Sequence, residues 1–511
     1  MSRFRSLHLS EPYLTFGLGQ QTLHPKDGLF LYGPQEPRPT AEIRTGAIGS
    51  QPSIDRLCRW MTEVSSFLPA YNERAHHSPF PGMEAAFGIK WPTMPFETIL
   101  IEEGELETRI RYDDPHRRVY DTVDLIVGKL LARKRKSDVR PDLWIVVLPE
   151  DVSRYGRPKS FVPKEQRVRT PNPGNPRAAK RARNEPYLFE EYEAERLPYQ
   201  YELNVHNQLN ARLLEDEIVT QVVRETTLAP EDFRREDGMI ARKIQDKATT
   251  AWNLGTTLYY KVAGPPWRLS KVRPDVCYIG LVYKVDASRP TSERVCCGAQ
   301  MFLATGEGVV FRGHLGPWDS VRKGEHHLDR STAREVIQEV IQSYNDEHGR
   351  VPKELFIHGK TRFTEDEWCG FQQAAGDIDV LSAIQIRKSR DVKMYRDKTK
   401  CTEGKHNLLR GSALITGKHS AYLWTSGFVP RLQTYPGWEV PNPYRVSIQK
   451  GDMDLQTVLE DVLGLTKLNF NSCIYGDGQP VTLRFADAVG EILTAGHDFR
   501  KLKPLPFKSY I

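Results

Sequence analysis

Apolar and polar positions follow two different periods along the chain, which predicts helices interleaved with short strands. Apolar residues recur at helical spacing over 119–132, 203–215 and 244–262. Between these stretches, the apolar runs in 143–151 and 218–223 are short enough to be strands buried on both faces. Helices that alternate with buried strands are typical of a parallel sheet covered on both sides. The middle of the chain is therefore predicted to be an α/β unit.

The N-terminal region has a different pattern. Its first 115 residues are rich in Gly and Pro, and they contain two short strand candidates, LTFGL and LFLYG. A turn is predicted at Pro25–Gly28, because Pro, Asp and Gly in succession favour a chain reversal. We therefore expect a strand-rich N-terminal segment over residues 1–115.

A connector rich in Pro and Trp, at 264–275, marks a predicted domain boundary. Three sheet-like segments follow it, at 276–285, 293–304 and 308–318, and then a helix and a strand at 354–360. Three early strands followed by a helix and a strand are the order of an RNase H-like fold. This order suggests that fold without being specific to it.

Composition narrows the class of protein. The 511 residues suffice for two or three domains with sizeable cores, and 39% hydrophobic residues fit a globular chain. No apolar run is long enough to span a bilayer, and the N-terminus lacks the apolar core of a signal peptide. The seven cysteines include no CxxC pair, which argues against a disulfide framework or a zinc knuckle. We therefore expect a cytoplasmic protein.

The distribution of charge says more than the net charge of +6. Residues 154–183 contain ten Lys or Arg and a single acidic residue, Glu165, interleaved with prolines. Such a stretch cannot bury enough apolar surface to fold alone. It fits a solvated surface insertion, a loop that follows phosphates, or a nuclear-localisation tract, and the composition leaves these interpretations open.

Four segments, taken together and in order, are far more specific than any one of them. They are HNQLNARLLEDEIVTQVVRETTL (206–228), TTLYYKVAGPPWRL (256–269), YIGLVYKV (278–285) and LTKLNFNSCIYGDGQPVTLRFADAVGEIL (465–493). This combination resembles the prokaryotic Argonautes, and among them the short ones that contain only MID and PIWI domains. The resemblance implies an α/β fold with an N-terminal segment (1–115), a Rossmann-like MID domain (116–266) that contains the basic insertion, and an RNase H-like PIWI domain (267–511).

In that family the MID domain holds the 5′-phosphate of a guide strand, and a buried phosphate needs cations and donors around it. The resemblance assigns this role to His206, Gln221 and Lys261. Asn210 stands where the family has a lysine, and Arg212 is a nearby cation that could reach the same phosphate. His206 taken alone also fits an ordinary surface histidine, so the assignment depends on the flanking matches.

The chain ends in LPFKSYI, which is apolar to its last residue. The resemblance implies that the carboxylate of Ile511 shares a Mg²⁺ with the guide phosphates, since two anions brought together need a hard cation between them. A simple tail on a strand edge is the alternative. We expect no NAD on this chain, because Gly17 and Gly19 are not followed by the third spaced glycine of a dinucleotide fingerprint.

An active PIWI domain cuts with carboxylates that hold two Mg²⁺ ions. The resemblance places the first carboxylate at Val282, two residues after Gly280, and the second at Gly359 in the turn after a strand. Neither side chain binds a metal ion, and Asp487 is left without these companions. We therefore expect no catalytic residues and a PIWI domain that binds without cutting.

Basic residues surround the vacated positions. Lys360, Arg362, Arg387 and Lys388 are predicted to contact the backbone of a guide–target duplex. Such phosphate contacts fix the register, and base pairing reads the sequence. A generic basic surface is the alternative interpretation of these residues.

The main hypothesis is a guided sensor in prokaryotic immunity. The resemblance implies that a guide RNA recognises complementary single-stranded plasmid or phage DNA. The chain then activates a partner with an APAZ segment fused to a TIR or Sir2 NAD-hydrolase, in a heterodimer or a higher oligomer. NAD⁺ depletion would cause abortive infection. The alternatives are a partner nuclease, an active guided endonuclease, and a nucleic-acid-binding structural protein without a guide.

Overall fold

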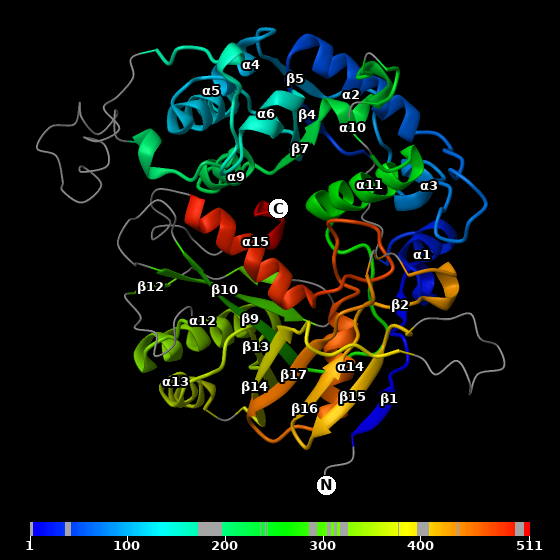
Figure 1. Ribbon diagram of the computed structural model, residues 1–511, viewed down its shortest axis with the longest axis vertical. Coiled ribbons are helices and arrows are strands. Elements are labelled where there is room, and N and C mark those ends of the chain that lie inside the picture. The colour runs from blue at the N-terminus through cyan, green and yellow to red at the C-terminus, as the bar shows by residue number, and fades with distance from the viewer. Residues whose placement is uncertain are drawn as a thin grey trace, which may run out of the picture.

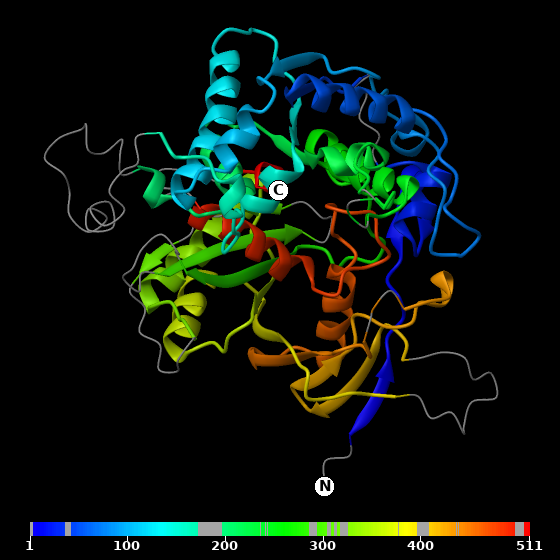
Figure 2. The ribbon, with the colours of Figure 1, turned by 45° about the horizontal axis from the view of Figure 1, so that its top comes forward.

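The structure of the protein is a computed structural model. It describes the chain apart from residues 1–3, 36–41, 172–196, 236, 241, 243, 286–293, 304–307, 311–313, 317–324, 377, 396–407, 436, 438, 496–504 and 511. Figure 1 shows two α/β units, one above the other, with helix α15 (Val481–Ala495) and the end of the chain between them. Figure 2 shows the same arrangement from a second direction. No helix in the described part of the chain is long and apolar enough to cross a membrane.

A ten-stranded sheet forms the lower unit. Its strands are β1 (Arg5–His8), β9 (Val276–Val285), β10 (Arg294–Leu303), β11 (Gly308–Val310), β12 (His314–Gly316), β13 (Glu354–Gly359), β14 (Val380–Lys388), β15 (Ser412–Gly417), β16 (Ser420–Leu423) and β17 (Tyr444–Lys450). The order is β1-β15-β16-β17-β14-β13-β9-β10-β11, and β12 also pairs with β10. At the centre, β13 runs parallel to both β9 and β14. The carboxyl ends of these three central strands therefore lie side by side, at the same end of the sheet.

Helices cover both faces of the large sheet. They are α12 (Arg330–His348) and α13 (Glu365–Ala375) on one face, and α14 (Leu455–Leu465) and α15 on the other. Side chains alternate along a strand. In β9, Tyr278 and Val282 join the core under α14 and α15, and Ile279 and Leu281 join the core under α12 and α13. This alternation decides which residues at the strand ends can meet.

A four-stranded parallel sheet forms the upper unit. Its strands, in spatial order, are β5 (Glu97–Leu100), β4 (Thr45–Gly49), β6 (Leu143–Leu148) and β7 (Thr220–Arg224). β4 and β6 are buried along their whole length, as expected for strands covered on both faces. The helices of this unit include α2 (Gln51–Val64), α5 (Pro115–Lys134), α9 (Val205–Leu213) and α11 (Lys247–Ala263).

The predicted boundary at residue 115 does not match this sheet. β4 and β5 precede residue 115, yet β4 pairs with both β5 and β6. The upper unit therefore begins before the predicted MID domain does. The reason is that the strand Thr45–Gly49 contains two glycines, and the ring of Trp144, a residue far away in the chain, fills the space beside Gly46. The sequence of a strand that depends on a neighbour's side chain in this way gives only a weak indication of β structure.

The described residues of the N-terminal segment form five short strands, which confirms the strand-rich segment. β2 (Leu14–Thr15) pairs with β3 (Gln21–Thr22) and with β8 (Arg268–Leu269), so LTFGL does supply a strand. The strand predicted at LFLYG and the turn at Pro25–Gly28 are wrong, because these residues form helix α1 (Pro25–Tyr32). The His24 ring accepts the N–H of Lys26 at 3.0 Å, and Pro25 suits the first helical turn.

The remaining elements are short. They are α3 (Met83–Phe87), α4 (Glu105–Ile110), α6 (Glu150–Tyr155), α10 (Glu225–Leu228), and the 3-10 turns η1 (Gly17–Gly19), η2 (Lys164–Gln166), η3 (Pro230–Asp232), η5 (Pro430–Leu432) and η6 (Phe507–Ser509).

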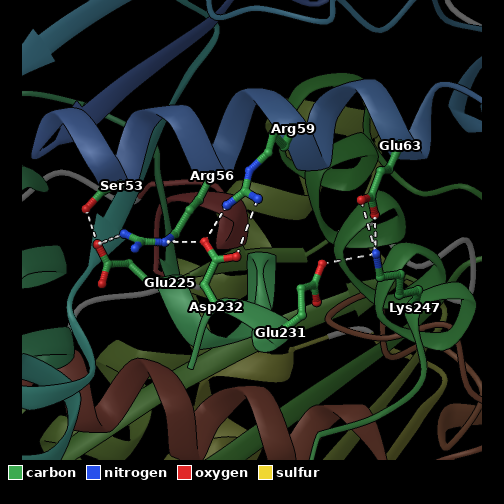
Figure 3. A network of polar contacts seen from close by, with 8 residues as sticks. All are labelled: Ser53, Arg56, Arg59, Glu63, Glu225, Glu231, Asp232 and Lys247. Atoms are coloured by element: carbon green, nitrogen blue, oxygen red, sulfur yellow. Dashed lines mark hydrogen bonds and ion pairs between the residues drawn. The ribbon is translucent and has the colours of Figure 1, made fainter. Parts of the chain in front are cut away.

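A network of ion pairs and hydrogen bonds joins α2 to residues that follow β7 and to Lys247, the first residue of α11 (Figure 3). Arg56 donates to Glu225 at 3.2 Å and to Asp232 at 3.1 Å. Lys247 lies 2.9 Å from Glu63. The other members are Ser53, Arg59 and Glu231. Every cation here has an acidic partner, so the network stabilises packing within the upper unit and leaves no unmatched positive charge.

Candidate nucleic-acid interface

Three elements of the upper unit bring the predicted phosphate-binding residues together. His206 and Asn210 lie one turn apart on α9, and Lys261 lies in the last turn of α11. The Thr220 hydroxyl of β7 donates to Asn210 Oδ1 at 2.9 Å, and Lys261 Nζ donates to the Thr220 carbonyl at 2.6 Å. Gln221 follows Thr220 in the strand. The recorded contacts join Asn210, Thr220 and Lys261. Together with His206, one turn before Asn210, and Gln221, next to Thr220 in the chain, we call these five residues the lysine pocket: His206, Asn210, Thr220, Gln221 and Lys261.

Lys261 is a buried cation without an acidic partner among the described residues. Its exposed fraction is 2%, and burial lowers its pKa to about 7. Two amide atoms of the pocket, Asn210 Nδ2 and Gln221 Oε1, also lack a hydrogen-bond partner within the described chain. Buried polar atoms are nearly always satisfied in native proteins. The lysine pocket therefore holds an unmatched positive charge and an unused donor, which are the groups that an anion requires.

His206 is the exposed member of the lysine pocket. Protein atoms surround much of the ring and lower its pKa, and the charge of Lys261 lowers the pKa further. The carboxylate of Glu491 on α15 acts in the opposite direction. His206 Nδ1 lies 3.2 Å from Asn207 Oδ1. The pKa of His206 therefore depends on the charge of Lys261 in the upper unit and on the charge of Glu491 on α15.

Arg212 does not join the lysine pocket through any contact that the structure records. Its guanidinium pairs with Asp124 of α5 and lies over the rings of Tyr120, at 4.7 Å, and Tyr201, at 5.7 Å. Two residues along a helix correspond to a rotation of about 200°, so Arg212 points away from the face that Asn210 occupies. The prediction that Arg212 replaces the missing lysine therefore has no structural support.

Ile511, the predicted Mg²⁺ ligand, lies outside the described residues. The residues before it turn inward: Tyr510 is 3% exposed, and the ring of Phe507 stacks on Phe485 of α15 at 3.7 Å. Phe507–Ser509 form a 3-10 turn in which the Phe507 side chain is buried, and the alternative of a tail on a strand edge stays open. The described members of the lysine pocket are a cation, an imidazole, a hydroxyl and amides, so by themselves they do not form a Mg²⁺ site.

The first vacated metal position lies under α15. Val282 is 4% exposed, on the face of β9 that α15 covers. Gly280 lies on the same face, where a Cβ atom would come within 2.1 Å of the Thr482 carbonyl oxygen. Glycine therefore lets α15 lie directly on the strand, and Val282 fills the adjoining space with an apolar side chain.

The second predicted position, Gly359, is displaced by one residue. A Cβ atom at Gly359 would meet the Phe363 ring at 2.7 Å, in the core under α12 and α13. Because side chains alternate, His358 and Lys360 point to the other face, toward α15. The residue that faces Asp487 from the end of β13 is therefore Lys360.

Two lysines surround the remaining carboxylate. Lys284 Nζ, from the end of β9, lies 3.3 Å from Asp487 Oδ1 and 3.1 Å from Glu491 Oε1. Lys360 pairs with the other oxygen of Asp487, and Gln479 donates to the same oxygen at 3.2 Å. Lys284 was not predicted from the sequence, although its position two residues after Val282 places it on the same face. Among the described residues, no group of three or more His, Cys, Asp or Glu side chains suits a metal ion.

The predicted backbone contacts divide between the two faces of the large sheet. Lys360, Arg362, Arg387 and Lys388 are the residues concerned, and all four are exposed. In β14, Ile384 and Ile386 belong to the core under α15, so alternation places Lys388 on that face and Arg387 on the other. The structure thus groups Lys388 with Lys360 and separates Arg387 from them.

The basic insertion is described only up to residue 171. There, Arg167 lies over the ring of Phe161 at 4.7 Å and donates to the Val162 carbonyl at 2.9 Å. Residues 172–183 lie outside the described chain, as do residues 396–400 of the second basic stretch. The three interpretations of the insertion stay open.

The two α/β units, with α15 between them, have the fold of the Argonaute proteins. Argonaute from Clostridium butyricum, solved with a guide DNA and a 19-mer target DNA, matches 98% of this chain and 54% of its own with a TM-score of 0.61 and 16% identity. Aa-Ago with an externally bound siRNA matches 98% of this chain and 55% of its own, with a TM-score of 0.53 and 14% identity. The Argonaute of A. aeolicus gives a TM-score of 0.53 and 14% identity over 97% of this chain and 53% of its own.

The chain thus spans about half the length of the solved structures that it matches. No family model and no curated protein matches it. At this level of identity the likeness establishes the fold, and the predicted α/β fold class is confirmed.

Proposed function

We propose that this chain binds the 5′ end of a guide strand and uses the guide to recognise complementary single-stranded nucleic acid. The observation that supports this most strongly is Lys261, a buried ammonium group without an acidic partner among the described residues, beside an unused donor of Asn210. A terminal phosphate has enough acceptor oxygens and charge for both groups. One solved structure with the same fold holds a guide DNA and a target DNA, which supports the same proposal.

The guide is proposed to be RNA and the target plasmid or phage DNA, on the basis of the resemblance to short prokaryotic Argonautes. On the same basis, a Mg²⁺ ion would lie between the guide phosphates and the carboxylate of Ile511, where it would neutralise the anions. The residues of the lysine pocket act separately from that ion. Lys261 supplies charge, and Gln221 and Asn210 supply amide groups for the phosphate oxygens.

We propose that the lower unit holds the duplex without cutting it. Val282 and Lys360 occupy the two strand-end positions that face α15, and neither offers a carboxylate. The ammonium groups of Lys284 and Lys360 already pair with Asp487. Positive charges a few ångströms away oppose the binding of a divalent cation. Enzymatic output is therefore proposed to belong to a partner, an APAZ protein with a TIR or Sir2 domain that hydrolyses NAD⁺.

The first experiment compares guides that differ only at the 5′ end. The purified chain should bind a 5′-phosphorylated RNA more tightly than the same RNA with a 5′-hydroxyl, and the loaded protein should capture complementary single-stranded DNA. With Mg²⁺ or Mn²⁺ present, the target strand should stay intact. Equal affinity for both guides would contradict 5′-end binding, and a single cut opposite the middle of the guide would contradict the inactive lower unit.

The second experiment identifies the partner. The chain is isolated from its host, and co-purifying proteins are identified by mass spectrometry. NAD⁺ should fall only when the partner, guide and complementary target are all present. Hydrolysis of NAD⁺ by the isolated chain would contradict the proposal. A complex that degrades DNA and leaves NAD⁺ intact would replace the NAD-hydrolase with a nuclease.

A further inference from the structure

A cavity with two connected parts lies at the amino ends of β5, β6 and β7, beside the last turn of α5. Its narrow part, of about 70 Å³, reaches Glu97 and Trp144. Its wide part, of about 660 Å³, opens between the end of α5 and Asp216. Both parts are lined by Lys134 and Arg140, and we call them together the α5 cavity. Within the described chain, no residue of the lysine pocket lines either part.

The narrow part combines apolar walls with one unused acceptor. Trp144 and Val219 line it, and so does Val139, which is 48% exposed. The side chain of Glu97 is only 9% exposed, and its Oε1 accepts from Arg133. Its Oε2 is buried and has no hydrogen-bond partner among the described residues, although buried polar atoms are nearly always satisfied. The narrow part therefore suits a flat ring that carries a single N–H donor at its edge.

The wide part is lined by more cations than carboxylates. The cations are Lys134, Arg135 and Arg140, and the carboxylates are Asp138 and Asp216. Lys134 Nζ lies 2.7 Å from Asp216 Oδ1, so these two charges match each other. Arg135 and Arg140 are exposed, and the described residues offer neither of them a recorded ion pair. The single carboxylate of Asp138 can offset only one of the two arginines, and guanidinium groups are well suited to phosphate.

We propose that the α5 cavity binds an adenine nucleotide, with the base in the narrow part and the phosphate at Arg135 and Arg140. The exocyclic amino group of adenine donates to Glu97 Oε2. Guanine fits less well, because its two adjacent donors call for both oxygens of a carboxylate and Arg133 already uses one. The wide part, at about 660 Å³, has the size of ordinary ligand sites, roughly 300–1,000 Å³.

The first test compares AMP with IMP, which has an oxo group in place of the amine. Isothermal titration uses the Lys261→Met protein, so that the proposed 5′-phosphate site contributes little. AMP should bind about tenfold more tightly than IMP, because the oxo group of IMP faces a carboxylate oxygen and offers no donor. Adenosine and inorganic phosphate should each bind more weakly than AMP, since each fills one part only. Equal affinities for AMP and IMP would overturn the proposal.

The variant Glu97→Gln, made in the same protein, should reverse this preference. Arg133 is a donor, so the amide oxygen of the variant stays with Arg133 and the amide NH₂ group turns to the cavity. That NH₂ group opposes the amine of adenine and donates to the oxo group of IMP. A purely structural role of Glu97 predicts no reversal. An unchanged preference for AMP would show that Glu97 does not contact the base.

The variant Arg140→Gln tests the wide part at an exposed position. It should weaken AMP binding by about three- to tenfold and leave adenosine binding unchanged, because only the phosphate contact is lost. Arg74→Gln is the matched control, since Arg74 is an exposed arginine between α2 and α3 that lines neither part. Equal AMP affinity in the two variants would overturn the phosphate site.

Two sources offer this ligand chemistry, a free nucleotide and the last nucleotide of a strand. Competition against bound AMP distinguishes them. Displacement by ADP but not by an oligoadenylate at equal concentration assigns the site to free nucleotides, and displacement by the oligoadenylate assigns it to a strand end. Displacement by neither would contradict an adenine nucleotide site. Guide loading by the wild-type chain is measured separately, and its failure would leave these results unchanged.

Discussion

Lys261 of the upper unit and Lys360 of the lower unit are both lysines of the candidate interface, but their surroundings differ. Lys261 is 2% exposed and has no acidic partner among the described residues, whereas Lys360 is 42% exposed and pairs with Asp487. A buried unmatched charge costs the free protein stability, and a bound anion would offset this cost. An exposed pair costs little and can change partners. Lys261 is therefore suited to one defined anion, whereas Lys360 can exchange its partner.

The largest expected effect is on the guide end. Lys261→Met should weaken binding of a 5′-phosphorylated guide by roughly 1.5–3 kcal/mol, the value of a hydrogen bond to a charged group. Binding of a 5′-hydroxyl guide should change much less. Competition titrations with labelled guides measure both affinities. Equal losses for the two guides would show that Lys261 supports the fold rather than the phosphate.

Lys467 is the matched control for Lys261. It is 1% exposed too, but it lies 3.0 Å from the carboxylate of Glu11. Lys467→Met removes the ion pair with Glu11 and should lower the melting temperature. Lys261→Met removes a buried charge that has no acidic partner among the described residues, and it should raise the melting temperature. If both variants lower the melting temperature, the contrast between the two buried lysines is wrong.

The pH dependence of stability follows from the same contrast. Burial lowers the pKa of Lys261 from its usual 10.5 to about 7, so between pH 7 and about 10 the unfolded chain binds more protons than the folded one. Stability should therefore rise with pH across this window. The contribution of Lys261 should be about 2 kcal/mol between pH 7 and pH 9.

Urea unfolding of wild type and Lys261→Met at these two pH values measures this contribution as a difference. The comparison is needed because Lys467, whose pKa is lowered to about 8, also makes the stability of both proteins rise with pH. Guide binding should change in the opposite direction and weaken above pH 7, because the neutral amine must take up a proton. Parallel pH profiles in the two proteins would contradict the lowered pKa of Lys261.

The smallest expected effect concerns metal binding in the lower unit. The double variant Val282→Asp, Lys360→Asp places two carboxylates beside Asp487, whereas Val282→Asp, Gly359→Asp places one of them against Phe363 on the opposite face. The first variant should bind Mn²⁺ more tightly, by about tenfold or roughly 1.4 kcal/mol, in isothermal titration. Equal Mn²⁺ affinity of the two double variants would favour Gly359, and not Lys360, as the vacated metal position.

Much of the fold could be predicted from the sequence, because its central helices and strands are long and strongly periodic. The exceptions have physical causes. LFLYG is helical because His24 and Pro25 start a helix there, although its composition favours a strand. The strand Thr45–Gly49 depends on Trp144 packing over Gly46, a contact between residues far apart in the chain. Local patterns do not contain such information.

The site was less predictable for a similar reason. A shift of one residue along a strand exchanges its two faces, so Gly359 and Lys360 could be told apart only when Phe363 and Asp487 had been placed. Lys284 could have been predicted from the sequence, because it lies two residues after Val282 and therefore on the same face of the strand. Arg212 could be assigned only by seeing Asp124 and the tyrosine rings that hold it.

The pairing of β1 with β15 has a consequence for the order in which the protein forms during synthesis. Arg5–His8 pairs with Ser412–Ile415, about four hundred residues later. β1 thus leaves the ribosome long before its partner is made, whereas the four-stranded sheet can form as soon as β7 has emerged. Until β15 is made, the N-terminal strand waits unpaired, and until β1 docks, β15 presents an open edge that other chains can join.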